Sequence, residues 1–179
     1  VNELIDAGAK GCFLEDQAWP KRCGHMAGKS VIPLEEHAAK LRAAVDARGN
    51  RDFFIVARTD AREATNSLEE AIRRAEAYQA TGVDALFLEP PRSHDELKEI
   101  PRRLKPPFVA NMLEGGVTPI LPRDELQALG FTIAVYPLTG LFAAARSQTE
   151  IFSHLRKTGT TRDVLDRLLT FHDFHGIVD

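Results

Sequence analysis

The sequence predicts an α/β fold, a set of parallel strands that belong to a (β/α)₈ barrel, and three observations indicate it. Short apolar runs alternate with amphipathic stretches along the whole chain. This alternation is typical of repeated βαβ units with a parallel sheet. The apolar runs are continuous, as expected of strands that are buried on both faces. Each run also ends in a polar residue.

Five apolar runs are the candidate strands. They are Gly11–Glu15, Phe53–Arg58, Ala85–Glu89, Phe108–Asn111 and Thr132–Tyr136. A charged group at a strand end costs stability unless it is paired or solvated, so five polar ends indicate a common site. The carboxyl ends of the strands are where a (β/α)₈ barrel builds its active site. A doubly wound sheet also binds ligands there and is the alternative fold, although no Gly-rich phosphate turn follows any strand.

Seven amphipathic stretches are the candidate helices. They are Asn2–Ala7, Leu34–Arg48, Ser67–Thr81, Ser93–Leu104, Arg123–Leu129, Leu141–Lys157 and Arg162–Phe174. Ser67 with Glu70, and Ser93 with Glu96, have the spacing of capping boxes. No linker or low-complexity segment interrupts the alternation, so we expect a single domain over residues 1–179.

The composition narrows the class of protein. With 44% hydrophobic and 27% charged residues and a net charge of −3, the chain has the profile of a soluble globular protein. That charge favours neither a nucleic-acid partner nor an anionic membrane surface, and no apolar run approaches the about 20 residues of a membrane span. Two cysteines without an export signal favour a reduced, cytoplasmic setting. We expect Cys12, within a strand, to be inert.

The densest polar feature is the loop Lys21-Arg22-Cys23-Gly24-His25. Neighbouring cations favour the reactive thiolate form of a cysteine. Lys21, Arg22 and a protonated His25 would supply that field, and Gly24 would let the loop approach a ligand closely. An exposed cationic loop with an incidental cysteine is the alternative. The combination of an unpaired loop cysteine with a histidine favours a functional loop with Cys23 as its acid–base group.

The strand ends supply the remaining candidates. Glu15 and Asp16 have opposite parity, so one should point into the barrel and the other away; an inward carboxylate suits Mg²⁺, and a salt bridge is the alternative. Arg58 can bind a substrate carboxylate through its two-pronged donor face. Asn111 offers an amide to a second carboxylate or an enolate oxygen, and Glu89 can orient His25 or a water. For these three the alternatives are ion pairs or a turn.

Taken together, the motifs resemble the isocitrate lyase/phosphoenolpyruvate mutase superfamily. The matching segments are Glu15-Asp16-Gln17, Lys21-Arg22-Cys23-Gly24-His25, Ala57-Arg58-Thr59-Asp60-Ala61, Asn111-x-x-Glu114-Gly115-Gly116 and Tyr136-Pro137-Leu138. They occur in the family's order and approximate spacing, over essentially the whole chain. The Asn-x-x-Glu-Gly-Gly turn is similar to that of the branch with 2,3-dimethylmalate lyase, oxaloacetate hydrolase and petal death protein. Methylisocitrate lyase and carboxyphosphonoenolpyruvate mutase are related members of the superfamily, and members similar to the latter carry a similar cysteine loop.

The resemblance implies a Mg²⁺-dependent enzyme, with Mn²⁺ as an alternative ion, that cleaves a carbon–carbon bond in a small 2-hydroxy dicarboxylate. The substrate would be a 2-alkylmalate, dimethylmalate or a methylisocitrate-like acid. It also implies a role for each candidate. The catalytic group is Cys23, His25 and Glu89, the substrate is bound by Arg58, Asn111 and Gly24, and Glu15 belongs to the metal site through water. Cys23 would protonate the enolate product.

Two departures from the family pattern favour a smaller substrate than methylisocitrate. Lyases of methylisocitrate usually carry an arginine a few residues after the Tyr-Pro-Leu segment, whereas Thr139–Phe142 holds no basic residue. They also tend to place a hydroxyl where this chain has Leu113. A carboxyphosphonoenolpyruvate-type phosphonomutase and an oxaloacetate hydrolase are the enzyme alternatives. A non-catalytic barrel fragment is the alternative outside enzymes.

Five strands are fewer than a (β/α)₈ barrel needs, since such a barrel takes about 250 residues. In the family the first three strands carry the aspartates that bind Mg²⁺ most directly. We therefore expect the C-terminal five strands of a barrel that lacks its first three, inactive alone and with an uncovered core face. The helix Arg162–Phe174 resembles the element that family members exchange between subunits, so we expect a homo-oligomer, a tetramer. The only other partner expected is a small carboxylate substrate.

Overall fold

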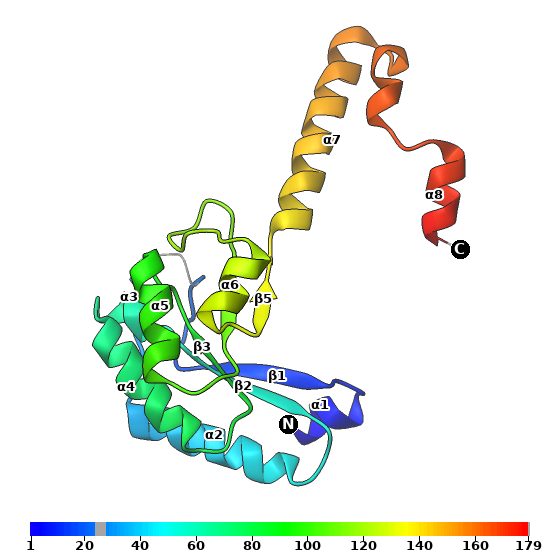
Figure 1. Cartoon of the computed structure of the whole chain (residues 1–179). Coiled ribbons are helices and arrows are strands. Elements are labelled where there is room, and N and C mark those ends of the chain that lie inside the picture. Colours follow the sequence, from blue (N-terminus) through cyan, green and yellow to red (C-terminus); the bar gives the residue numbers. More distant parts are fainter. Residues whose placement is uncertain (24–27, 179) are drawn as a thin grey trace. The chain divides into compact units, whose positions relative to one another are not determined.

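A computed structural model describes residues 1–23 and 28–178 of the chain. The chain divides into two compact units, Val1–Pro137 and Leu138–Asp179. The first unit carries all the strands of the described chain, and the second is helical (Figure 1). The predicted site residues belong to the first unit.

The five strands are β1 (Gly11–Glu15), β2 (Phe54–Thr59), β3 (Ala85–Leu88), β4 (Val109–Asn111) and β5 (Ile133–Val135). β1, β2 and β3 form one parallel sheet in that order, and β4 pairs with β5 in parallel. A parallel bridge between Leu86 and Phe108 joins β3 to β4. Consecutive strands are therefore neighbours that run in one direction, which confirms the parallel α/β prediction. Every strand begins and ends within one residue of its predicted range.

The helices are α1 (Asn2–Asp6), α2 (Leu34–Arg48), α3 (Ala61–Ala64), α4 (Leu68–Gln79), α5 (His94–Arg103), α6 (Arg123–Leu129), α7 (Thr139–Thr158), the 3₁₀ helix η1 (Arg162–Arg167) and α8 (Phe171–Val178). Both predicted N-caps are confirmed. Ser67 Oγ accepts the backbone N–H of Glu70 at 3.1 Å, and Ser93 Oγ accepts that of Glu96 at 3.1 Å. Each cap satisfies one of the backbone donors that the first turn leaves without an intrahelical partner.

The predicted single helix Arg162–Phe174 is wrong, because the segment breaks into η1 and α8. Val164 has non-helical angles (φ −135°, ψ 18°), and Leu168 is extended (φ −111°, ψ 148°). Thr170 then starts a new helix, since its Oγ1 accepts the backbone N–H of Asp173 at 3.1 Å and donates to the Asp173 carboxylate at 2.7 Å. This local side-chain cap is more favourable here than a continuous helix, so a new helix begins.

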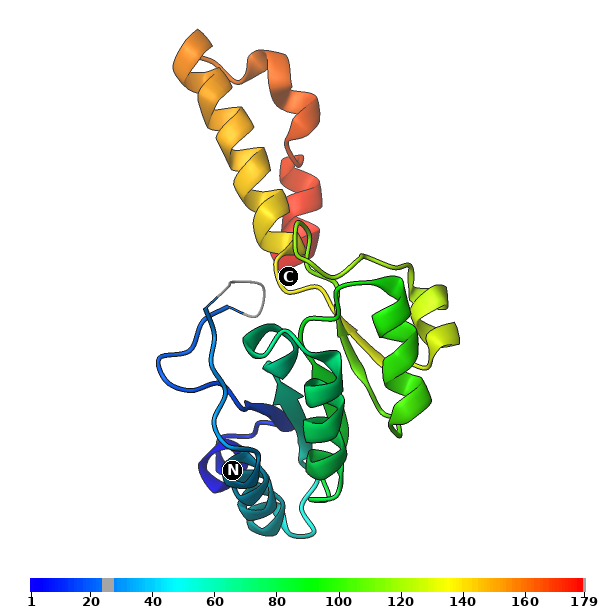
Figure 2. The same cartoon turned by 90° about the vertical axis from the view of Figure 1, so that its left-hand side faces the viewer.

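The helices of the first unit cover one face of the sheet (Figure 2). On that face Ala57, Leu86 and Leu88 pack with Leu41 and Ile72 from α2 and α4 in a single apolar core. Alternate residues of the strands point the other way. They line a cavity of about 300 Å³ whose walls include Phe13, Val56, Phe87, Val109, Ile133 and Val135.

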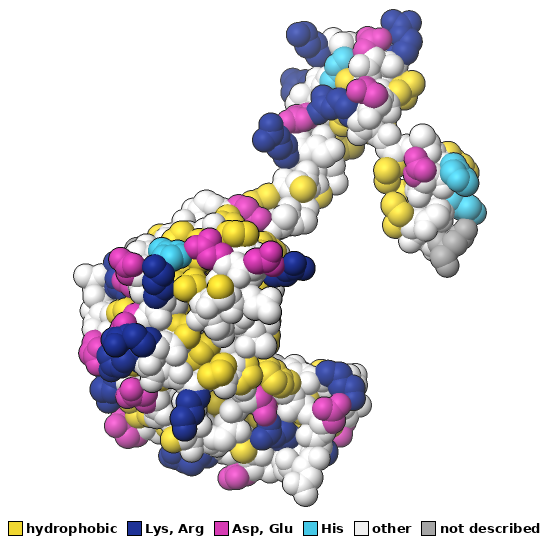
Figure 3. Space-filling view, viewed as in Figure 1, with side chains coloured by type: hydrophobic (Ala, Val, Ile, Leu, Met, Phe, Trp, Pro, Cys, Tyr) yellow, Lys and Arg dark blue, Asp and Glu magenta, His cyan; other side chains and the backbone are white. Residues whose placement is uncertain are grey.

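This second face is open, as Phe13 at 56% exposure illustrates. An apolar strand face of this kind normally packs against further structure. The finding agrees with the expectation of an uncovered core face. On the face of the first unit that Figure 3 shows, Lys and Arg side chains are interspersed with Asp and Glu side chains.

Within the described residues, no helix has the length and apolar character that crossing a membrane would require.

Candidate active site

The carboxyl ends of the strands bring four predicted site residues to one edge of the open face. Glu15 and Arg58 are register partners in β1 and β2, and Glu15 Oε2 lies 3.4 Å from Arg58 Nε. Glu89, just after β3, accepts a hydrogen bond from Asn111 Nδ2 at 2.8 Å. Arg58 and Asn111 both line the 300 Å³ cavity. The fold therefore places Glu15, Arg58, Glu89 and Asn111 at one edge of the open face.

The Arg58 guanidinium is held rigidly. Its Nε and Nη2 donate to the two carboxylate oxygens of Asp60 at 2.9 and 3.0 Å, and its carbon Cζ stands 4.9 Å from the centre of the Phe87 ring. Burial opposes the charge, but the hydrogen bonds of Asp60 and the charges of Asp60, Glu89 and Glu15 raise the pKa of Arg58. Its bonds to Asp60 use Nε and Nη2, and among the described residues Nη1 donates to no acceptor.

Asp60 is a buried carboxylate with two cationic partners. Besides Arg58 it binds Lys29, whose Nζ donates to Oδ1 at 3.0 Å, and neither the Lys29 nor the Asp60 side chain has any solvent exposure. Burial alone would raise the pKa of Asp60, but Arg58 and Lys29 together outweigh it and the pKa is lowered. Asp60 is thus ionised at neutral pH. The sequence reasoning did not single out Asp60 or Lys29, because their pairing depends on the fold.

Glu15 and Asp16 face opposite sides, as their parity predicted. Glu15 lies on the open side, between Arg58 and Lys21, whose Nζ is 3.2 Å from its carboxylate. Asp16 is fully buried on the helix side. Its carboxylate accepts hydrogen bonds from Thr59 Oγ1 (2.8 Å), Tyr78 OH (2.9 Å), Arg74 Nη1 (3.1 Å) and the backbone N–H of Asp60 (2.9 Å). Asp16 therefore holds strand ends in place and is not available to a ligand.

Glu15 fits one position of a magnesium shell. Its Oε2 is buried and accepts no hydrogen bond from the described residues, and carboxylate oxygen is the ligand that Mg²⁺ prefers. Within residues 1–23 and 28–178, no group of three or more His, Cys, Asp and Glu side chains could hold a metal ion. Glu15 can thus supply one ligand, directly or through water.

Cys23 is an exposed free thiol in the segment after β1. Gln17 fixes the start of this loop, since its Nε2 donates to the Arg22 carbonyl at 2.9 Å and its Oε1 accepts the Arg22 N–H at 2.8 Å. No hydrogen bond in the described part of the chain joins Cys23 to the strand-end cluster. Gly24 and His25 lie outside the described residues. Cys12 is half-buried, and burial raises the pKa of its thiol, as an inert role requires.

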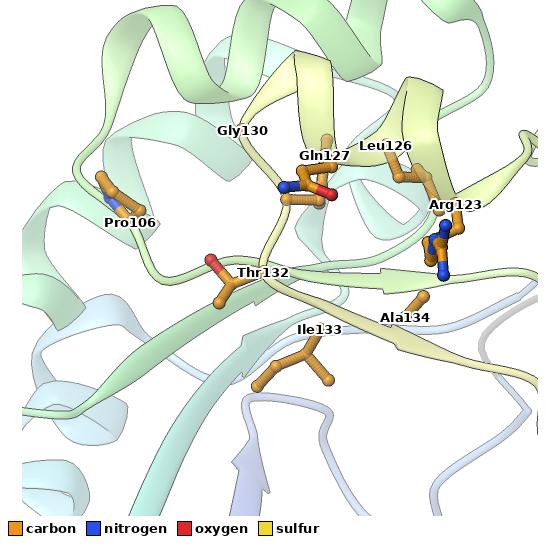
Figure 4. Close-up of a pocket in the computed structure, with 9 residues that line it drawn as sticks. Pro106, Arg123, Leu126, Gln127, Gly130, Thr132, Ile133 and Ala134 are labelled. Atoms are coloured by element: carbon orange, nitrogen blue, oxygen red, sulfur yellow. The ribbon is translucent and has the colours of Figure 1, made fainter.

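A second cavity, of about 560 Å³, lies beside α6 and β5 (Figure 4). Its walls are Pro106, Arg123, Leu126, Gln127, Gly130, Phe131, Thr132, Ile133 and Ala134. None of the predicted site residues belongs to it. Among the described residues that line it, Arg123 is the only charged one.

Comparisons with known proteins identify the relatives of this chain. The family model described as phosphoenolpyruvate phosphomutase matches residues 1–156. The chain is 55% identical to the chloroplastic carboxyvinyl-carboxyphosphonate phosphorylmutase of Arabidopsis thaliana, over 100% of this chain and 53% of that protein. It is 52% identical to the petal death protein of Dianthus caryophyllus (99% and 56%) and 41% identical to the 2,3-dimethylmalate lyase of Eubacterium barkeri (99% and 61%).

Solved structures show the same fold. An oxaloacetate acetylhydrolase with the inhibitor 3,3-difluorooxalacetate superposes with a TM-score of 0.83 at 35% identity, over 89% of this chain and 54% of that one. A phosphonopyruvate hydrolase in complex with oxalate and Mg²⁺ superposes with a TM-score of 0.78 at 29% identity, over 95% and 59%. The chain thus spans between half and two thirds of the length of the relatives it matches.

Proposed function

Because the chain belongs to the phosphoenolpyruvate phosphomutase family of the isocitrate lyase superfamily, we propose that the protein containing it is a Mg²⁺-dependent carbon–carbon lyase. Its substrate is a small 2-hydroxy dicarboxylate, such as a 2-alkylmalate, dimethylmalate or a methylisocitrate-like acid. The observation that carries the proposal is the geometry of Arg58. This buried guanidinium donates two hydrogen bonds to Asp60, and its Nη1 remains for a carboxylate. Arg58 and Asn111 both line a cavity of about 300 Å³.

The proposed chemistry is a retro-aldol cleavage. Arg58 binds the substrate carboxylate, and Asn111, oriented by Glu89, lies beside it to bind a second oxygen. A base removes the hydroxyl proton, the bond between carbons 2 and 3 breaks, and its electron pair forms an enolate. The Cys23 S–H then donates its proton to that carbon as the general acid, and His25 supports the thiol. Mg²⁺, when bound, supplies electrostatic stabilisation of the oxyanion, and Glu15 would hold it through water.

The fold proposal is that the five strands form part of a (β/α)₈ barrel whose other strands come from the rest of the protein. The parallel order of β1 to β5 supports it, as does the open apolar face. The relatives have additional length. Closing the barrel would cover Phe13 and would bring further carboxylates to the Glu15 edge. The chain by itself is therefore proposed to be inactive.

We also propose that the protein is a homo-oligomer, a tetramer, in which the helices of the second unit pack against a neighbouring copy. The second unit exposes apolar side chains that a monomer rarely leaves in water. They include Leu141, Phe152, Leu165, Leu169, Phe171, Phe174 and Ile177. Exchange of α8 and its flanking segment would bury them.

A phosphonomutase is the second candidate, because a relative at 55% identity bears that name. Hydrolysis of oxaloacetate is a third, from the acetylhydrolase structure. The Cys23 thiol favours the lyase, since delivering a proton to carbon needs a donor and a phosphoryl migration does not. A non-catalytic fragment would have no use for the thiol.

The test is turnover by the full-length protein with Mg²⁺, offered 2-alkylmalates and, separately, a phosphonopyruvate-type substrate. Cleavage of the alkylmalate should fall by about 10²–10⁴-fold in Cys23→Ser, the usual contribution of a general acid. Cys12→Ala is the matched control and should keep its kcat. Turnover of the phosphonate alone would replace the lyase by the mutase, and an unchanged rate in Cys23→Ser would remove the thiol from the mechanism.

A further inference from the structure

The loop that carries Cys23 is closed at its base by backbone pairing. The N–H of Ala18 donates to the Ser30 carbonyl at 2.9 Å, and the N–H of Ile32 donates to the Asp16 carbonyl at 2.9 Å. Gln17 and Val31 form the antiparallel bridge between these two bonds. The segments 16–18 and 30–32 therefore lie side by side, and both ends of the loop are tied to the carboxyl end of β1.

Lys29 lies directly beyond this ladder and reaches across to the next strand. Its ammonium donates to Asp60 Oδ1 at 3.0 Å, in full burial. The same carboxylate binds Nε and Nη2 of Arg58. One buried carboxylate therefore joins the base of the Cys23 loop to the guanidinium that faces the open cavity.

The contact of Lys29 and Arg58 with the same Asp60 carboxylate also affects the electrostatic potential at Arg58. Arg58 is surrounded by the negative charges of Asp60, Glu89 and Glu15, which would weaken its attraction for an anionic ligand. Because Lys29 also pairs with Asp60, the Asp60 carboxylate neutralises less of the positive charge of Arg58. A lysine at this place thus both anchors the loop and preserves positive potential at Arg58.

We propose that Lys29 is a positioning residue that, through Asp60, holds the Cys23 loop in register with the Arg58 guanidinium. The catalytic meaning rests on the proposed function, in which Arg58 binds the carboxylate and Cys23 delivers the proton. The anchoring itself does not depend on that function. Register matters because a misplacement of about 1 Å in a catalytic group can cost about 10²-fold in rate.

Amide hydrogen exchange tests the anchoring on the chain without any assay of activity. In Lys29→Met the backbone amides of Ala18 and Ile32 should exchange with solvent at least about tenfold faster. Removing one partner of a buried ion pair lowers stability by more than a tenfold change in the opening equilibrium requires. Lys29→Arg, which keeps the charge, should restore protection. Lys40→Met is the matched control, since Lys40 pairs with Glu36 on the exposed surface of α2. Unchanged exchange in Lys29→Met would overturn the proposal.

If Lys29→Met does not fold, Asp60→Asn provides the same test, since it keeps the shape of the side chain and removes its charge. Faster exchange at Ala18 and Ile32 in that variant supports the bridge. Wild-type protection in Asp60→Asn overturns it.

Steady-state kinetics of the full-length protein test whether the anchoring by Lys29 contributes to catalysis. Lys29→Met should lower kcat by about 10–10²-fold, because the loop loses its register, and should also raise KM, because Asp60 then neutralises more of the charge of Arg58. Lys29→Arg should rescue both parameters. A wild-type kcat in Lys29→Met would overturn the positioning role. Absence of turnover in the unaltered protein would instead contradict the proposed function, and the exchange result would still decide the anchoring.

Discussion

Arg58 shows how the fold orients a strand-end residue that we propose as a binding group. Its place at the end of β2 follows from the continuous apolar run that precedes it, and the sequence alone predicts that run as a strand. Its orientation was not, because it depends on Asp60 and on the Phe87 ring of the neighbouring strand. The guanidinium lies in a site where an ion pair is stronger than at the surface. Its geometry therefore decides which ligand it can bind.

Arg58→Lys tests this geometry. An ammonium cannot grip Asp60 with two nitrogens and still offer a third to a carboxylate, so substrate binding should weaken. We expect KM of the full-length protein to rise about 10–100-fold. This rise corresponds to the binding free energy that one hydrogen bond to a charged group contributes. Arg123→Lys, at a side chain that is 87% exposed, is the control. An unchanged KM in Arg58→Lys would show that this residue does not bind the substrate.

His37 makes the stability of the fold depend on pH. The ring is buried in α2, with its centre 4.8 Å from that of Tyr78. Burial lowers the pKa of His37 below its ordinary value, although Asp16 and a backbone contact with Leu14 act in the opposite direction. The unfolded chain therefore binds the proton first as the pH falls.

The free energy of unfolding should accordingly decrease as the pH falls below about 6.5, the ordinary pKa of histidine. Urea titrations at a series of pH values measure it. His37→Leu should remove this part of the pH dependence, whereas His172→Leu, in exposed α8, should leave it in place. A wild-type slope in His37→Leu would assign the effect to other groups.

At the scale of elements, the strand ends depend on Asp16. Its carboxylate joins β1 to the end of β2 through Thr59 and the backbone of Asp60, and to α4 through Arg74 and Tyr78. Burial, with the neighbouring charge of Asp16, raises the pKa of Tyr78 well above its usual range. The tyrosine therefore remains a donor.

Asp16→Asn should destabilise the protein by about 3–5 kcal/mol, because it leaves Arg74 buried with reduced compensation. The midpoint of urea unfolding measures the loss. Asp52→Asn is the matched control, since Asp52 pairs with Lys10 in full solvent exposure and should not change the midpoint. An Asp16→Asn midpoint equal to that of the wild type would mean that other contacts hold the strand ends.

The elements were predictable to different degrees for physical reasons. Strands were found to within a residue because each is an apolar run that ends in a polar group. α3 was missed because it is short and starts at Asp60, whose carboxylate is used by Arg58 and Lys29 and caps nothing. The amphipathic pattern of residues 162–174 does not reveal the break before α8, because a local side-chain cap between Thr170 and Asp173 starts the new helix. The Lys29–Asp60 pair depends on topology, which no local pattern contains.

At the scale of the whole molecule, the exposed apolar residues of the second unit predict assembly. Light scattering should give a species larger than one chain. Leu169→Asp with Phe171→Asp should reduce the mass, because charges would replace side chains that are 63% and 89% exposed and proposed to be covered by a neighbour. Gln148→Asp, on exposed α7, is the control for added charge. A monomeric wild type would contradict the proposed assembly.

The central claim is that the protein breaks a carbon–carbon bond and that Cys23 protonates the carbon released. The most direct measurement is the reaction of the full-length protein with a 2-alkylmalate and Mg²⁺ in D₂O, followed by NMR. We expect an oxo acid and a second carboxylate that carries one deuterium at the carbon that lost the bond, and we expect Cys23→Ser to form this product about 10²–10⁴-fold more slowly. Failure to cleave any 2-hydroxy dicarboxylate, or a deuterated product formed at the wild-type rate by Cys23→Ser, would contradict it.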